Sequence, residues 1–389
     1  MAAAQADVRG GLDAGGESTS GAPAPARRAW RWLAAAIVAG TLAIVWLAGL
    51  RQGVLFLIGV GYGAALTAVA FGFTTGWRVW IRERDPTGLL AQFLLLALAM
   101  VISLPLLAAF PQDLTPAAGP LSVSLVIGAF VFGAAMQVAD GCGSGTLYKA
   151  GLGNPINLVA LPGFIAGSFL GSLHLDAWLR LGSLGPVTLQ THLGTGGALA
   201  AQLLVLAVLA AAAWRFRRRL NTRWRGSAVF IAAIALALLA VANLVIAGQP
   251  WGIVYGLGLW GAKVAMAFGW DPAGTAYWGS AAQMQQLAAP VLDDVTSVTN
   301  IGLLIGALAV ALRRGTALPA AAPTPTQWIA GIVAGLVLGY TARLAFGCNV
   351  GAYFSGITTG SLHGWVWFAA AFAGSIVGVR LRARLGFSG

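Results

Sequence analysis

The chain has 389 residues, of which 58% are hydrophobic and only 9% are charged, and its mean hydropathy is +0.82. A soluble domain carries about a quarter charged residues, so the composition excludes a water-soluble protein and indicates an integral membrane protein. The net charge of +12 is nearly all arginine between apolar runs. It fits the positive-inside bias of membrane loops and not a nucleic-acid-binding surface, so we expect contact with membrane lipid and none with nucleic acid.

Residues 1–28 are rich in Ala, Gly, Ser and Pro and are predicted to form a disordered tail. Residues 29–51 are predicted to form an extra N-terminal transmembrane helix, because Trp32–Leu50 is uncharged and long enough to span a bilayer. A cleaved signal peptide is the alternative. The apolar run is long for one, and no A-x-A site follows it.

Further long uncharged runs predict an all-α polytopic membrane protein with about ten transmembrane helices and shorter re-entrant pieces. Proline-bearing turns such as Gly248-Gln249-Pro250 are expected to separate consecutive spans. A basic segment, 215–226, divides the chain and is expected to be a cytoplasmic linker. It separates two predicted transport repeats, 52–214 and 227–389.

Basic clusters between the runs are expected to mark the cytoplasmic side. They are Arg27/Arg28/Arg31, Arg78/Arg82/Arg84, Arg215 to Arg225, Arg313/Arg314 and Arg380/Arg382/Arg384. Placing all five on one side is expected to require that Pro272–Leu292 crosses the membrane. If that segment only dips in and out, the orientation of everything after it is reversed.

A short Gly-rich kink, Ala-x-Gly followed by an aromatic residue or cysteine, occurs four times in the apolar sequence. The copies are Ala70-Phe71-Gly72-Phe73, Ala139-Asp140-Gly141-Cys142, Ala267-Phe268-Gly269-Trp270 and Ala345-Phe346-Gly347-Cys348. The two aromatic kinks lie 197 positions apart and the two cysteine kinks 206. We therefore predict pseudo-two-fold repeats in which Phe73 matches Trp270 and Cys142 matches Cys348.

Broken helices are tolerated within a membrane only where they are buried in protein or line a polar cavity. The kinks therefore predict one shared pathway, and free N–H groups at helix N-termini favour an anion. The predicted pathway residues, besides Phe73 and Trp270, are Cys142 with Gly141, Gly143, Ser144, Gly145 and Lys149, and Cys348 with Arg343, Gly347, Asn349 and Gly351.

Several of these residues have structural alternatives. Lys149 and Arg343 are equally explained by contact with lipid headgroups or by pairing with Asp140 and Asp271. Lys263 is a further charge near a kink. The tyrosines that follow three of the kinks, Tyr148, Tyr277 and Tyr353, can donate hydrogen bonds to an anion, although Tyr277 is better explained as an interfacial anchor.

The two cysteines are the only ones in the chain, and no CxxC pair or metal-ligand spacing is present. We therefore expect no disulfide framework, metal or cofactor. A lone cysteine in an apolar helix is usually a small hydrophobe. Because both occupy the same place in a repeated kink, we interpret them as free thiols that contact a sulfur-containing ligand.

The two cysteine segments resemble the YeeE/YedE sulfur-transport family. The resemblance rests on Gln137–Thr146 with Gly151-Leu152-Gly153-Asn154, and on Arg343–Ala352 with Phe354-Ser355-Gly356-Ile357. Gly72–Arg78 resembles the family's opening kink, and the whole similarity covers roughly residues 53–380. The family implies a bacterial inner-membrane protein that takes up thiosulfate through an hourglass of helices with a central constriction.

In that family the cysteines at the constriction are thought to pass the ion along by S–H contacts with its sulfur, and Cys142 and Cys348 match two of them. Thiosulfate-uptake members carry a third cysteine, where this chain has aromatic kinks. The family therefore also implies other sulfur or selenium species as substrates. A small cytosolic carrier of the TusA type is a partner that the resemblance implies.

We therefore expect a transporter or channel, not an enzyme, for a sulfur-containing anion, with thiosulfate first. No nucleotide-binding G-x-x-x-x-G-K-[ST] motif occurs, so transport would depend on an ion gradient or on downhill flow. A membrane sulfurtransferase with a cysteine persulfide is the second hypothesis, and it needs an accessible thiol of low pKa. A structural or assembly protein is the third and would leave the kinks unexplained.

Overall fold

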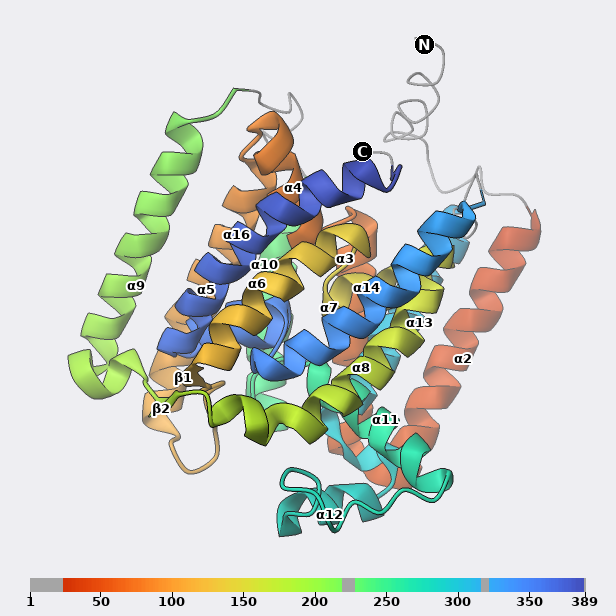
Figure 1. The fold of residues 1–389 in the computed structure, drawn as a ribbon. Helices are drawn as coiled ribbons and strands as arrows, with labels where there is room; N and C mark the ends of the chain where they lie inside the picture. Colours follow the sequence, from red (N-terminus) through yellow and green to blue (C-terminus); the bar gives the residue numbers. More distant parts are fainter. Residues whose placement is uncertain (1–23, 219–227, 316–321, 388–389) are drawn as a thin grey trace.

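The computed structural model describes residues 24–218, 228–315 and 322–387, and these form an all-α polytopic membrane protein. Among them, ten helical stretches are long and apolar enough to cross a membrane, which confirms the prediction of about ten spans (Figure 1). Two short strands, β1 (Pro120–Ser122) and β2 (Ser183–Pro186), pair antiparallel outside the spans.

Seven of the spans are single helices: α2 (Ala24–Ala48), α5 (Thr87–Ala109), α8 (Pro155–Leu179), α9 (Leu189–Arg215), α10 (Ala228–Ala247), α13 (Val295–Arg314) and α16 (Leu362–Arg384). Three are broken within the membrane: α3 (Leu50–Ala68) with α4 (Phe73–Glu83), α6 (Val123–Val138) with α7 (Gly143–Gly151), and α14 (Pro325–Leu344) with η3 (Asn349–Phe354) and α15 (Ser355–Thr358). The helices α11 (Val254–Ala267) and α12 (Ala281–Ala288) and the turn η2 (Val291–Asp293) are too short to span.

The order of the ten spans brings the described parts of all five basic clusters to one end of the molecule. We call this end the inner face; the N- and C-terminal helices reach it at the top of Figure 1. The opposite end, where α12 lies, is the outer face. Positions 1–23 of the predicted tail and 219–227 around the predicted linker lie outside the described residues.

The expectation that Pro272–Leu292 must cross the membrane is wrong. The segment contains only the short, largely exposed helix α12 and returns to the outer face. The helix α11 does not cross the membrane either. Neither segment between α10 and α13 therefore changes the side, and the five clusters still share one face. The 14 residues of α11 are joined to the apolar run of α10, so the sequence presents the two as a single span.

Three glycine-lined helix pairs hold the broken helices together: α3 with α13, α8 with α14, and α6 with α16. A Cβ atom placed on Gly306 would lie 2.1 Å from the carbonyl oxygen of Val60. One on Gly339 would lie equally close to the carbonyl of Phe164. Since lipid offers helices no hydrophobic driving force to associate, such close backbone packing is what stabilises a membrane bundle.

Candidate functional site: a thiol centre between a cationic cluster and a buried arginine edge

The breaks that precede the two cysteines have the same backbone geometry. Asp140 and Phe346 both adopt the left-handed conformation, with φ of 57° and 55°. The following glycine N–H donates back five residues in each case, from Gly141 to Met136 and from Gly347 to Ala342. These bonds satisfy carbonyls at the end of one helix segment, as breaks within a membrane require. Cys142 and Cys348 then become the N-caps of α7 and η3.

The two thiols are free, buried and gathered around Gly143. A Cβ atom on Gly143 would lie 2.8 Å from Sγ of Cys348, so only glycine lets that sulfur approach the start of α7. The Cys142 Sγ lies 3.4 Å from the Ser144 hydroxyl, with the N–H groups of Ser144 and Gly145 directed at it. A Cβ on Gly145 would lie 3.7 Å from the same sulfur.

The Cys348 sulfur has a matching set of donors. The backbone N–H groups of Val350, Gly351 and Gly143 are directed at it. Next to it, Asn349 is fully buried, and neither its amide nitrogen nor its amide oxygen has a hydrogen-bond partner among the described residues. Two helix N-termini with free donors therefore converge at the thiols, an arrangement suited to an anion.

Two further helix starts reach this centre, and they correct the register expected for the aromatic kinks. Gly72, not Phe73, is the N-cap of α4, and Ala70 two residues earlier has a φ of 50° like Asp140 and Phe346. Gly72 is therefore the residue at the position of the two thiols. Phe73 lies one residue later, buried, with its ring 6.0 Å from that of Tyr353.

The fourth helix start belongs to α11. Its N-cap, Ile253, lies against Gly143, where an added Cβ would be 3.3 Å from the Ile253 side chain. The turn that begins at Gly248 thus leads the chain inward to the thiols instead of only separating two spans. Trp270 is not part of this centre: it packs at the other end of α11, with its ring 4.9 Å from that of Phe169. The residue pattern does not show that the turn before α11, at Gly248, reaches the thiols while the turn after it, at Trp270, does not.

Several buried polar side-chain atoms on the thiol-bearing segments and on the elements packed against them have no partner in the described part of the chain. They are buried, and among the described residues none has a hydrogen bond: the hydroxyls of Thr74, Thr146, Tyr62 and Tyr353, the amide of Asn349 and the indole N–H of Trp251. The Thr74 hydroxyl is within reach of the Cys142 sulfur, and the Trp251 ring stacks on Tyr62 at 3.8 Å. Buried polar groups normally have partners, so this cluster is suited to a polar ligand.

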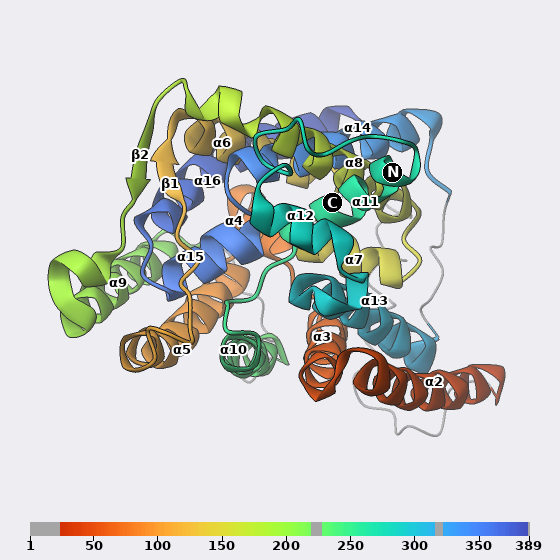
Figure 2. The same ribbon diagram turned by 90° about the horizontal axis from the view of Figure 1, so that it is seen from below.

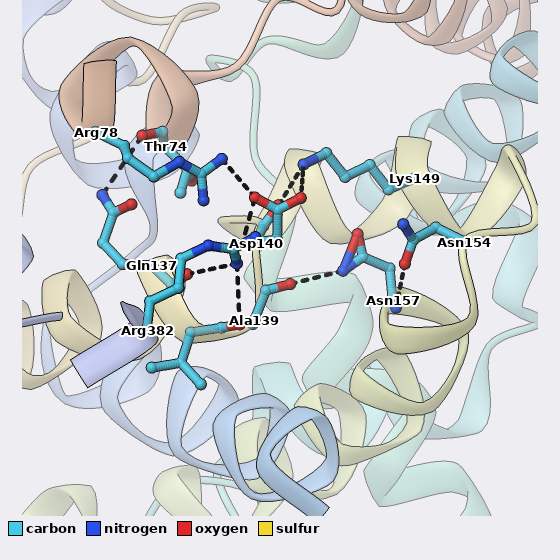
Figure 3. A network of polar contacts seen from close by, with 10 residues as sticks. Thr74, Arg78, Gln137, Ala139, Asp140, Lys149, Asn154, Asn157 and Arg382 are labelled. Carbon is cyan, nitrogen blue, oxygen red and sulfur yellow. Dashed lines mark hydrogen bonds and ion pairs between the residues drawn. The ribbon is translucent and has the colours of Figure 1, made fainter. Parts of the chain in front are cut away.

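On the inner side of the thiols, Asp140 is surrounded by three cationic side chains (Figure 3). Its carboxylate accepts from Arg78 at 2.6 Å and from Lys149 at 2.5 Å, and lies 3.6 Å from Arg382. Lys149 therefore pairs with Asp140, one of its two structural alternatives. Two of these cations, Arg78 and Lys149, are hydrogen-bonded to the one carboxylate, so within the described part of the chain the cluster keeps an excess of positive charge.

Arg343 lies towards the outer side and does not pair with Asp271. The Asp271 carboxylate instead accepts from the backbone N–H of Ala273. The Arg343 guanidinium is surrounded by the rings of Tyr277, Tyr255 and Trp278, at 4.8, 5.7 and 5.7 Å. Tyr277 is thus more than an interfacial anchor. In the sequence, Arg78 and Arg382 fit only the positive-inside pattern, because their proximity to Asp140 depends on how the broken helices pack.

This arrangement of helices broken within the membrane around two buried thiols defines a multi-pass membrane protein with a polar centre. The chain belongs to the Sulphur transport family, whose family model matches residues 68–377. The resemblance seen in the cysteine segments is therefore confirmed, and the protein is a multi-pass protein of the bacterial inner membrane.

Three relatives are similar to the chain. It is 28% identical to the probable transporter YedE of Salmonella typhimurium and 29% identical to that of Escherichia coli, each over 149 residues. These matches cover 38% of this chain and only 36% of either YedE protein. The chain is also 24% identical to the thiosulfate transporter TsuA of Spirochaeta thermophila over 327 residues, which are 80% of this chain and 92% of that protein.

Proposed function

We propose that the protein takes up a sulfur-containing anion, thiosulfate first, by passing it between Cys142 and Cys348. The observation that carries the proposal is the convergence of the two free thiols, each an N-cap, around Gly143. The name of the similar TsuA protein points to the same ion.

The oxygens of the anion accept hydrogen bonds from backbone N–H groups at the starts of α7 and η3, where helix dipoles add positive potential. The thiols donate S–H to its terminal sulfur, a soft atom that a hydroxyl matches less well. The Thr74 and Asn349 side chains supply further polar contacts. No covalent bond forms in this scheme, so both thiols stay reduced.

The inner cluster supports inward movement. Its excess positive charge lies beyond the thiols on the side of the basic inner face. An anion leaving Cys142 would meet Lys149 and Arg78 next. Asp140 limits how strongly they hold it, because conduction requires sites that bind weakly enough to release.

A sulfurtransferase is less consistent with the site. A persulfide-forming cysteine needs an accessible thiolate stabilised by a base or cation. Both sulfurs here are buried, and the partners described for them are hydroxyls and backbone N–H groups. The hydrogen bonds of His363 within the described residues are with Ser361 and Gly119, not with either thiol.

Growth on single sulfur sources tests the proposal. A bacterial host that lacks its own sulfate and thiosulfate uptake should grow on thiosulfate only when this protein is present. Sulfate, sulfite and a selenium oxyanion are supplied in parallel, and the Cys142→Ala/Cys348→Ala variant is the control. Growth that is the same with the double variant would rule out the thiol route.

A further inference from the structure

The Arg343 side chain has a hydrogen-bonding edge that no group of the described residues uses. Its Nε and Nη2 atoms are buried and have no acceptor, and no ion pair among those residues involves it. These two atoms form the side of the guanidinium that holds a carboxylate or oxyanion through two parallel hydrogen bonds. Burying such donors unpaired is costly.

Arg51 provides a comparison within the same chain. The same two atoms, Nε and Nη2, donate to the carbonyls of Ile246 and Ala247 at 2.8 and 2.7 Å. These carbonyls close the C-terminal end of α10, so the Arg51 edge is fully used in stabilising the fold. The unused edge of Arg343 therefore calls for a different explanation.

A glycine of α11, Gly258, faces that edge, and no side chain of its own covers the two donors. A Cβ on Gly258 would lie 3.0 Å from Nη2 and 3.2 Å from Nε, so the glycine keeps the edge uncovered. The same point is 2.9 Å from the Ser168 hydroxyl. The three aromatic rings contact the guanidinium through cation–π interactions, which use none of its N–H donors.

The segment that follows α11 lies over α11 at the outer face (Figure 2), and its Tyr277 and Trp278 contact Arg343. It is tied down at three points. Tyr255 donates to the Gln283 side chain at 2.9 Å, and Trp278 donates to Ser172 at 2.6 Å. Lys263 donates to the carbonyls of Leu287 and Ala289, both at 2.6 Å.

We propose that Arg343, with Tyr255, Tyr277 and Trp278, forms an outer binding site that captures a tetrahedral sulfur oxyanion before it reaches the thiols. The inference rests on the proposed function for the identity of the ion. Arg343 lies five residues before Cys348, on the last turn of α14, so an ion released from it has the Cys348 break directly ahead. The outer site binds the oxygens of the anion, and the thiols contact its sulfur.

Equilibrium binding of radiolabelled thiosulfate to purified protein tests the site apart from the thiols. The background is Cys142→Ala/Cys348→Ala, which removes the thiols and leaves Arg343. We expect saturable binding in this background, weakened at least tenfold by Arg343→Lys, which keeps the charge and loses the two-donor edge. Gly258→Ala should weaken it as well by filling the space at that edge. Arg51→Lys is the matched control and should leave the affinity unchanged.

Equal affinity of the Arg343→Lys and parent proteins, at unchanged elution and melting temperature, would overturn the inference. So would the absence of binding in the thiol-free background. Uptake assays separate this failure from failure of the proposed function. With wild-type thiols, Arg343→Lys should raise KM for thiosulfate and leave the maximal rate largely intact. If the wild-type protein takes up no sulfur anion, the proposed function fails, and the binding assay still decides whether the outer site exists.

Discussion

Asp140 is the residue on which the inner cluster depends. It has the left-handed φ of 57° that forms the α6–α7 break, and its carboxylate contacts Arg78 and Lys149. Removing one partner from a buried ion pair leaves uncompensated charge, at a cost of roughly 3–5 kcal/mol. Asparagine tolerates the left-handed backbone, so Asp140→Asn removes the carboxylate charge without disturbing the backbone of the break.

Asp140→Asn should therefore lower the melting temperature of the purified protein strongly. The Asp140→Asn/Lys149→Met double variant should recover part of the loss, since it removes one of the stranded cations. Thermal unfolding in detergent, followed by size-exclusion chromatography, measures both. A single variant as stable as the wild type would show that the cluster does not hold the break together.

The residue pattern predicts both thiols, Lys149 and Arg343 as pathway residues, and this stays a prediction; it places the first aromatic kink one position off. An aromatic side chain follows the glycine at Phe73 and Trp270, as a thiol does elsewhere. The register is set by which residue adopts a positive φ, and at Ala70 that residue is not glycine. Residue type gives no sign of such a conformation, so only the structure shows that Gly72 holds the thiol position.

This register makes a prediction about the third cysteine that thiosulfate-uptake members of the family carry. Gly72→Cys should fold, because its backbone is extended with a φ of −138° and the nearest atom to a new Cβ is the Thr75 hydroxyl at 3.1 Å. It should support thiosulfate uptake at least equal to the wild type. Phe73→Cys, the matched control, loses the ring contact with Tyr353 and should take up less. The reverse order in labelled uptake would contradict the assigned register.

At the scale of helices, spans were predictable where length and hydropathy decide them, and the all-α architecture is confirmed. Re-entry was not predictable for α11, because what sets it is close packing against other helices. For α11 this packing includes Gly261, where a Cβ would lie 2.9 Å from the carbonyl of Ile165 in α8. The glycine-lined pairs show the same kind of packing between segments far apart in the chain: Gly59 and Gly63 of α3 face Gly302 and Gly306 of α13.

Gly306→Ala should thus destabilise the protein by about 1–3 kcal/mol, the usual range for overpacking a tight core. The new methyl group would meet the carbonyl of Val60. Gly196→Ala is the control, since nothing lies within 4 Å of a Cβ there. Melting temperatures of the two variants, compared with the wild type, measure the effect. Equal melting temperatures would show that α3 and α13 are free to move apart.

For the whole molecule, the ten spans predict a single orientation, with the basic clusters inside and the α12 segment outside. Ala276 and Arg217 are exposed on the two faces. A membrane-impermeant thiol reagent should label Ala276→Cys in intact cells and Arg217→Cys only after the membrane is opened. The native thiols are buried and contribute little background. Labelling of Arg217→Cys in intact cells would reverse the assignment of faces.

We also propose that the two halves of the chain are related by a pseudo-two-fold axis. Under this symmetry α6 corresponds to α14, and α8 corresponds to α16. The close pair of α8 with α14 then corresponds to the close pair of α16 with α6. Cys142 then exchanges with Cys348, as the kinks suggested. Gly72 exchanges with Ile253, so the partner of the first kink is the start of α11 and not the turn at Trp270.

The central claim is that the thiols carry a sulfur anion, and uptake by Cys142 variants tests it most directly. Cys142 is flanked by Gly141, Gly143 and Gly145, and the Ser144 hydroxyl lies beside its sulfur, whereas the donors described at the Cys348 sulfur are backbone N–H groups. The assay measures uptake of labelled thiosulfate into proteoliposomes at matched protein content, with sulfate as competitor. Cys142→Ala should abolish uptake, Cys142→Ser should also fail because it lacks the soft sulfur, and sulfate should compete poorly with the wild type. Wild-type uptake by Cys142→Ala would contradict the account and leave Cys142 as a small buried hydrophobe.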